Sequence, residues 1–176
     1  MNVFNNWGPD NCLTLLSIIL MAIGGIFALI QWNSSEKFKR VKYLDEIITK
    51  LRFDSEMAET LYTIDYNYNW YTRNFHDDHD FEYKIDKVLS YIDFICYLYS
   101  MGNIKYNEFK IIEYRIKRIC TSPSTQKYLW NLYHFSKKTG AECSFAHIIK
   151  YGIKNKIIEK EFIDNDLYGD CKYLNF

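Results

Sequence analysis

Residues 13 to 30 read LTLLSIILMAIGGIFALI, a run of about eighteen residues without a charged side chain. A helix of this length and composition can span the hydrocarbon core of a bilayer. We therefore predict a transmembrane helix over residues 13–32, preceded by a short extracytoplasmic tail, residues 1–12. Trp7 and Trp32 flank the run and would lie roughly 37 Å apart on a continuous helix, which suits two interfacial anchors.

The charges around the run predict its orientation. Lys37, Lys39, Arg40 and Lys42 follow it, whereas only Asp10 precedes it. Cytoplasmic flanks carry the excess of Lys and Arg, so we expect the N-terminus outside and the remaining chain in the cytoplasm. A cleaved signal peptide is the alternative, but no Lys or Arg precedes the run and no A-x-A-like cleavage site follows it.

Small residues inside the run form a notch that would let two helices approach closely. Gly24 and Ala28 are one helical turn apart, with Gly25 beside them. Such a small-xxx-small pair predicts an oligomerisation face, although these residues are also ordinary in membrane helices.

The rest of the chain has the apolar periodicity of helices, so the predicted fold class is all-α. We expect a juxtamembrane amphipathic helix over residues 33–53, a bundle of about five helices over residues 54–160, and an acidic C-terminal tail over residues 161–176. Asn33 and Glu36 have capping-box spacing, although the membrane helix could instead run on through them. The apolar stripe of the juxtamembrane helix consists of Phe38, Val41, Leu44, Ile48 and Leu51.

Helix boundaries in the bundle follow from cap residues. Asp54 or Ser55 can begin the first helix, Gly102 can end the second, and Asn107 can begin the third. Ser122 before Pro123 predicts the start of a helix that closes at Gly140, and Ser144 the start of a shorter one.

The first bundle helix is predicted to run from Ser55 to Phe75. Its apolar residues alternate in steps of four and three, as on a heptad seam; they are Met57, Leu61, Ile64, Tyr68, Tyr71 and Phe75. We interpret the aromatic lower half as core packing. The alternative is a surface that stacks on a base or another ligand.

The stretch His76 to Asp80 reads HDDHD and is the one concentration of site-like residues. On a continuous helix His76, His79 and Asp80 would share a face and could hold zinc or iron. The seam, however, ends at Phe75 and a new one begins by Phe81, so we interpret HDDHD as a corner between helices. There Asp78 or Asp80 would cap the following helix, and Asp80 and Glu82 would favour its N-terminal dipole.

Other chemistry is not indicated. The five cysteines form no CxxC pair, which predicts reduced, mostly buried thiols; they are Cys12, Cys96, Cys120, Cys143 and Cys171. Lys+Arg and Asp+Glu both number 22, so net charge does not favour nucleic acid. We interpret Lys110, Arg115, Lys117 and Arg118 as a solvated helix face. No phosphate loop, nucleophile elbow or H-E-x-x-H motif occurs, and His134 and His147 stand alone, so we expect no enzyme and no cofactor.

The layout of one N-terminal span, a basic helix, and the segments IDKVLSYIDFICYLYSMGNI and KYLWNLYHFSKK resembles uncharacterised small bacterial single-pass membrane proteins, some of which accompany phage-defence systems. The resemblance implies an inner-membrane protein with a cytoplasmic helical sensing or interaction domain. Expected partners are membrane lipid, an unidentified protein and a second copy of the chain. The alternatives are an oligomeric membrane-disrupting effector and a metal-dependent hydrolase using HDDHD.

Overall fold

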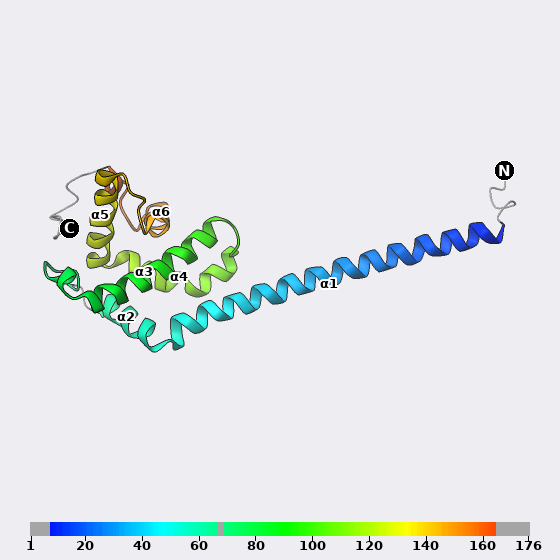
Figure 1. The fold of residues 1–176 in the computed structure, drawn as a ribbon, viewed down its shortest axis with the longest axis horizontal. Helices are drawn as coiled ribbons and strands as arrows, with labels where there is room; N and C mark the ends of the chain where they lie inside the picture. Colours follow the sequence, from blue (N-terminus) through cyan, green and yellow to red (C-terminus); the bar gives the residue numbers. More distant parts are fainter. Residues whose placement is uncertain (1–7, 67–68, 165–176) are drawn as a thin grey trace. The chain divides into compact units, whose positions relative to one another are not determined.

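The computed structural model describes residues 8–66 and 69–164, and within these ranges every regular element is helical (Figure 1). The predicted all-α class is therefore confirmed. The α-helices are α1 (Pro9–Phe53), α2 (Ser55–Tyr66), α3 (His79–Ser100), α4 (Tyr106–Thr121), α5 (Pro123–Thr139) and α6 (Ala146–Lys154), and the 3-10 turns are η1 (Phe75–Asp77) and η2 (Lys160–Ile163). Three residues named in the sequence analysis lie outside the described residues: the predicted anchor Trp7, the seam residue Tyr68 and the cysteine Cys171. Most of the predicted acidic tail lies outside them as well.

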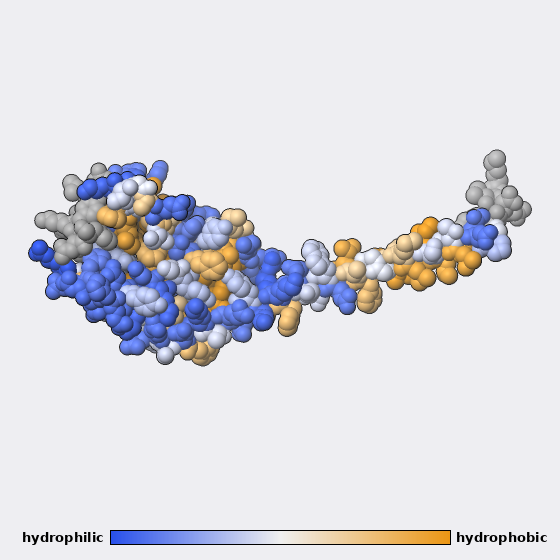
Figure 2. All heavy atoms as spheres, viewed as in Figure 1, coloured by the Kyte–Doolittle hydropathy of each residue, from blue (hydrophilic) through white to orange (hydrophobic). Residues whose placement is uncertain are grey.

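Helix α1 is one unbroken helix that contains the whole apolar run. The large apolar side chains from Leu13 to Ile30 are between 43% and 69% exposed, and Figure 2 shows hydrophobic residues along this part of the helix. By length and composition α1 can cross a membrane. It does not stop at Asn33, so the capping-box pattern there begins no new helix.

The chain divides into two compact units, residues 1–47 and residues 48–176. The last turn of α1 belongs to the second unit: Leu51 is buried, and the Lys50 ammonium lies 4.8 Å from the centre of the Tyr91 ring on α3. Phe38 and Val41, from the same predicted stripe, are exposed. Of the predicted stripe, Leu51 is therefore buried while Phe38 and Val41 stay exposed, because periodicity identifies a face of a helix but does not supply a partner for it.

Helix α3 is the centre of the bundle and packs against α2, α4 and α6. Apolar side chains at three- and four-residue intervals form its inward face and are at most 2% exposed; they are Ile85, Val88, Leu89, Ile92, Ile95 and Cys96. Tyr99, which continues this spacing, is half-buried. The inward face of α4 has the same regular spacing, with Phe109, Ile112, Ile116, Ile119 and Cys120 buried. On α5 the buried face is wider than a single apolar stripe, although Leu132 is only half-buried. It includes Tyr128, Leu129 and Ser136, together with Trp130, Asn131 and His134, whereas Phe135 is exposed.

Most predicted caps are confirmed. The Asp54 carboxylate accepts the Met57 amide at 3.0 Å, and the Ser122 hydroxyl accepts the Thr125 amide at 3.4 Å. Gly102 and Gly140 follow α3 and α5 with φ of 75° and 73°, a backbone conformation that glycine adopts without steric cost.

Four boundaries differ from the predicted ones. Helix α6 begins at Ala146, with Phe145 rather than Ser144 at its cap position. Helix α4 begins at Tyr106, so Asn107 lies inside it; the Glu108 carboxylate accepts the Lys105 amide at 2.7 Å and takes the capping role. Helix α2 ends at Tyr66 rather than at Phe75. Packing also continues into the segment predicted as an acidic tail, because Phe162 is 0% exposed against the bundle.

Candidate functional site

The HDDHD stretch forms a helix corner, as the preferred interpretation predicted. His76 and Asp77 end the 3-10 turn η1, and Asp78 caps α3 by accepting the Phe81 amide at 3.1 Å. Asp80 lies in the first turn of α3 and pairs with Lys84 at 2.6 Å. Asp78 and Asp80 therefore both stabilise the start of α3.

The structure does not bring His76, His79 and Asp80 together as metal ligands. His76 precedes the cap and His79 is the first residue of α3, so the three residues do not share a continuous helix. Within residues 8–66 and 69–164 there is no group of three or more His, Cys, Asp or Glu side chains with the geometry to hold a metal ion. The geometry of the corner gives no support to the hydrolase alternative.

His76 instead joins the corner to α3. Its Nδ1 lies 2.7 Å from a carboxylate oxygen of Glu82, and its Nε2 lies 3.5 Å from the Tyr71 hydroxyl. The Tyr71 hydroxyl in turn accepts the Asn131 amide at 2.6 Å. This chain of contacts links the corner to α3 and α5, which is a structural role for the histidine.

An aromatic cluster lies beneath the corner. Trp70, Tyr71 and Phe75 are at most 5% exposed, and the Tyr71 and Phe75 rings lie 5.1 Å and 5.2 Å from the Tyr128 ring in edge-to-face geometry. Such pairs are worth about 0.5–1.5 kcal/mol each beyond their burial. The core-packing interpretation of these rings is confirmed, although they do not lie on α2.

The Tyr128 hydroxyl donates to the Asp86 carboxylate at 2.6 Å. Burial raises the pKa of Asp86 above its ordinary value, while the hydrogen bond from Tyr128 acts in the opposite direction. The folded state therefore holds this proton more tightly than the unfolded chain does. The stabilisation from the protonated carboxyl is complete below the unfolded pKa, about 3.9, and is lost as the pH rises through the folded pKa.

The two histidines that appear isolated in the sequence both have partners. His134 is buried and its Nε2 lies 3.0 Å from the Phe162 carbonyl oxygen. His147 Nδ1 lies 2.9 Å from Asp93, whose other oxygen accepts the backbone amides of His147 and Ile148 at 2.8 Å. Asp93 of α3 thereby caps α6, although it lies 54 residues from His147 in the sequence. This His–Asp pair therefore has a structural role.

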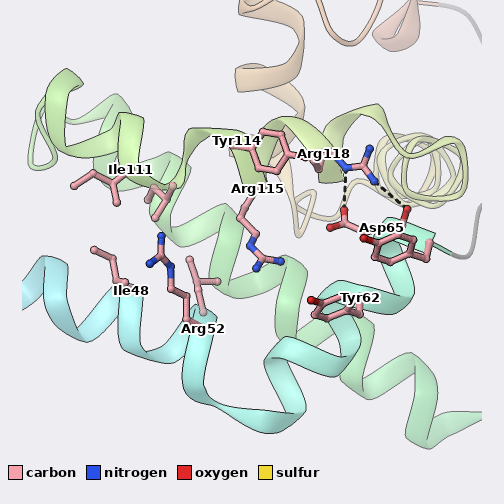
Figure 3. Close-up of a pocket in the computed structure, with 11 residues that line it drawn as sticks. Ile48, Arg52, Tyr62, Asp65, Ile111, Tyr114, Arg115 and Arg118 are labelled. Carbon is pink, nitrogen blue, oxygen red and sulfur yellow. Dashed lines mark hydrogen bonds and ion pairs between the residues drawn. The ribbon is translucent and has the colours of Figure 1, made fainter.

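A pocket of about 440 Å³ lies between the last turn of α1, α2 and α4. Figure 3 shows Arg52 reaching from α1 and Arg115 from α4 into the same space. Arg118 is held by Asp65 on α2, through a guanidinium–carboxylate contact of 3.4 Å and a hydrogen bond of 3.2 Å to the Asp65 carbonyl oxygen. Because this lining combines three arginines with one carboxylate, we call it the arginine pocket.

No family model, curated protein or solved structure matches the chain.

The arginine pocket corrects the interpretation of the basic residues of α4. Lys117 behaves as a solvated side chain paired with Glu113 at 3.0 Å, but Arg115 and Arg118 line the pocket. No local pattern indicates this, because Arg52 is brought opposite them only by tertiary packing. A second pocket, of about 580 Å³, lies between α3, α4 and α6 and includes His147 and Lys150 in its lining.

Proposed function

We propose that the protein is a single-pass membrane protein whose helical bundle acts by association at the cytoplasmic face. The observation that carries this proposal is the apolar part of α1, which is long enough to cross a bilayer and exposes its large side chains all around. In water such a surface would aggregate, whereas in lipid it needs no protein partner.

Association rather than catalysis fits the side-chain arrangement in the bundle. The two histidine–carboxylate pairs have structural roles: His76 with Glu82 holds the helix corner, and Asp93, the partner of His147, caps α6. Burial raises the pKa of the Cys96 and Cys120 thiols, that of Cys120 to about 12, which makes both poor nucleophiles. In keeping with the resemblance to proteins that accompany phage-defence systems, the biological setting we propose is bacterial defence or stress response.

Affinity capture tests the association directly. Two differently tagged copies of the full chain are expressed in bacteria, and membranes are cross-linked, solubilised and captured on one tag. We expect mass spectrometry to identify a partner that the full chain recovers and a chain ending at Phe53 does not, whereas a second copy recovered by both chains would be held through α1. Recovery of the same proteins by both chains would contradict a role for the bundle.

The same capture distinguishes self-association through the Gly24, Gly25 and Ala28 face. No atom lies within 4 Å of a Cβ added at Gly24 in the single chain, so we expect Gly24→Leu to leave the fold intact. If two spans meet at this face, Gly24→Leu should reduce recovery of the second copy severalfold. Gly8→Leu, which has equally open surroundings, is the matched control outside the apolar run. Unchanged recovery of the second copy with Gly24→Leu would exclude self-association through this face. It would also exclude the assembly step that the membrane-disrupting alternative requires.

A further inference from the structure

The arginine pocket concentrates positive charge that the protein itself does not neutralise. Arg52 and Arg115 have no ion-pair partner among residues 8–66 and 69–164, and Asp65 is the one carboxylate in the lining and is already paired with Arg118. Arg115 is half-buried and Arg52 is exposed, and like charges that face the same space repel each other. An anion between the two helices would remove this repulsion.

The chemistry of the lining selects the kind of anion. A guanidinium offers parallel N–H donors whose spacing matches two oxygens of a phosphate, so two arginines facing one space suit a phosphate group better than a halide. The volume, about 440 Å³, falls within the usual range for small-molecule sites and exceeds what a single phosphate fills. The site therefore has room for an organic group attached to the phosphate.

Aromatic rings provide a place for that organic group. Tyr62 and Tyr66 line the pocket and stack on one another, with ring centres 5.6 Å apart and an angle of 12° between the rings. They are 58% and 71% exposed, so their outer faces are available to a planar or apolar group.

We propose that the arginine pocket binds a small phosphate-bearing anion, with Arg52 and Arg115 as its phosphate ligands and Tyr62 and Tyr66 beside its organic part. Asp65 pairs with Arg118 at the edge of the site, so Arg118 is not one of the proposed phosphate ligands. An anion held by Arg52 and Arg115 would tie the last turn of α1 to α4. This proposal goes beyond the proposed function and is independent of membrane insertion.

The test is calorimetric titration of the full-length chain in neutral detergent micelles at low salt. The probes are pyrophosphate, AMP and the soluble short-chain lipid dihexanoyl phosphatidic acid. We expect saturable binding of at least one probe with a Kd below about 1 mM. Binding of dihexanoyl phosphatidic acid alone would assign a lipid headgroup, and binding of AMP or pyrophosphate a free phosphate compound.

Variants locate the binding. Arg52→Ala and Arg115→Ala should each weaken it by about tenfold or more, the usual effect of losing a hydrogen bond to a charged group. Asp65→Asn should tighten it, because a negative charge leaves the pocket while the Asp65 carbonyl still holds Arg118. Lys127→Ala removes an exposed positive charge on α5, outside the pocket, and should change the Kd less than twofold.

Two outcomes would overturn the proposal. One is the absence of saturable binding of all three probes up to about 10 mM, which is weaker than a specific site should be. The other is a loss of affinity with Lys127→Ala equal to that with Arg115→Ala. That result would mean that the probes are attracted by the overall charge of the protein and not by the pocket. Neither result would affect the membrane anchor, which is tested by fractionation.

Discussion

A chain carrying Ile19→Asp together with Ile23→Asp should be lost from the membrane. Both side chains lie in the apolar part of α1 and are about half exposed, at 46% and 54%. An aspartate near the centre of a membrane helix costs about 2.5–3.5 kcal/mol, so the pair should cost roughly 5–7 kcal/mol. That shifts the insertion equilibrium by more than about a thousandfold.

Flotation on a sucrose gradient after carbonate extraction measures this effect, because membranes float and aggregated protein does not. The matched control is Val41→Asp with Phe53→Asp, which replaces two exposed apolar residues of α1 outside the run. This control should float like the unaltered chain. Flotation of the Ile19/Ile23 double variant with the membranes would mean that the apolar run is not the anchor.

Phe162→Ala should lower the free energy of unfolding of the bundle by about 3–5 kcal/mol, the usual cost of deleting a buried aromatic ring. Phe162 is 0% exposed, and its carbonyl oxygen lies 3.0 Å from Nε2 of the buried His134. Typical domains are stable by about 5–15 kcal/mol, so this one change could remove much of the total.

Denaturant-dependent labelling of the buried thiols Cys96 and Cys120 measures the unfolding. These thiols are at most 2% exposed, so they react only when the bundle opens. Glu161→Ala, an exposed neighbour, should change the stability by less than about 0.5 kcal/mol. An effect of Phe162→Ala as small as that of the control would mean that Phe162 does not pack on the bundle.

The sequence predicts well those features that depend on nearby residues. The apolar run predicts the exposed first part of α1, and Asp78, Ser122, Gly102 and Gly140 mark helix ends through bonds or backbone angles within a few positions. Interior faces with regular spacing, such as that of α3, are predictable for the same reason.

Features that depend on tertiary packing are not visible in the sequence. The seam through Tyr71 and Phe75 keeps its heptad spacing beyond the end of α2, but Tyr71 lies in a loop and Phe75 begins η1, and both rings pack on Tyr128. The asparagines in this stretch favour turns over helix interiors, a preference that the spacing does not register. Asp93 with His147, and Arg52 with Arg115, come from helices far apart in the chain, so no local pattern indicates either pair.

Labelling of single cysteines by a membrane-impermeant maleimide in bacterial spheroplasts tests directly whether α1 spans the membrane with the bundle in the cytoplasm. Cys12, Cys143 and Cys171 are replaced by serine, and the buried Cys96 and Cys120 remain because burial raises the pKa of both thiols. A Gly8→Cys chain should be labelled in intact spheroplasts, and a Lys127→Cys chain only after the membrane is permeabilised. Labelling of Lys127→Cys in intact spheroplasts, or of Gly8→Cys only after permeabilisation, would contradict a span with the N-terminus outside and the bundle in the cytoplasm.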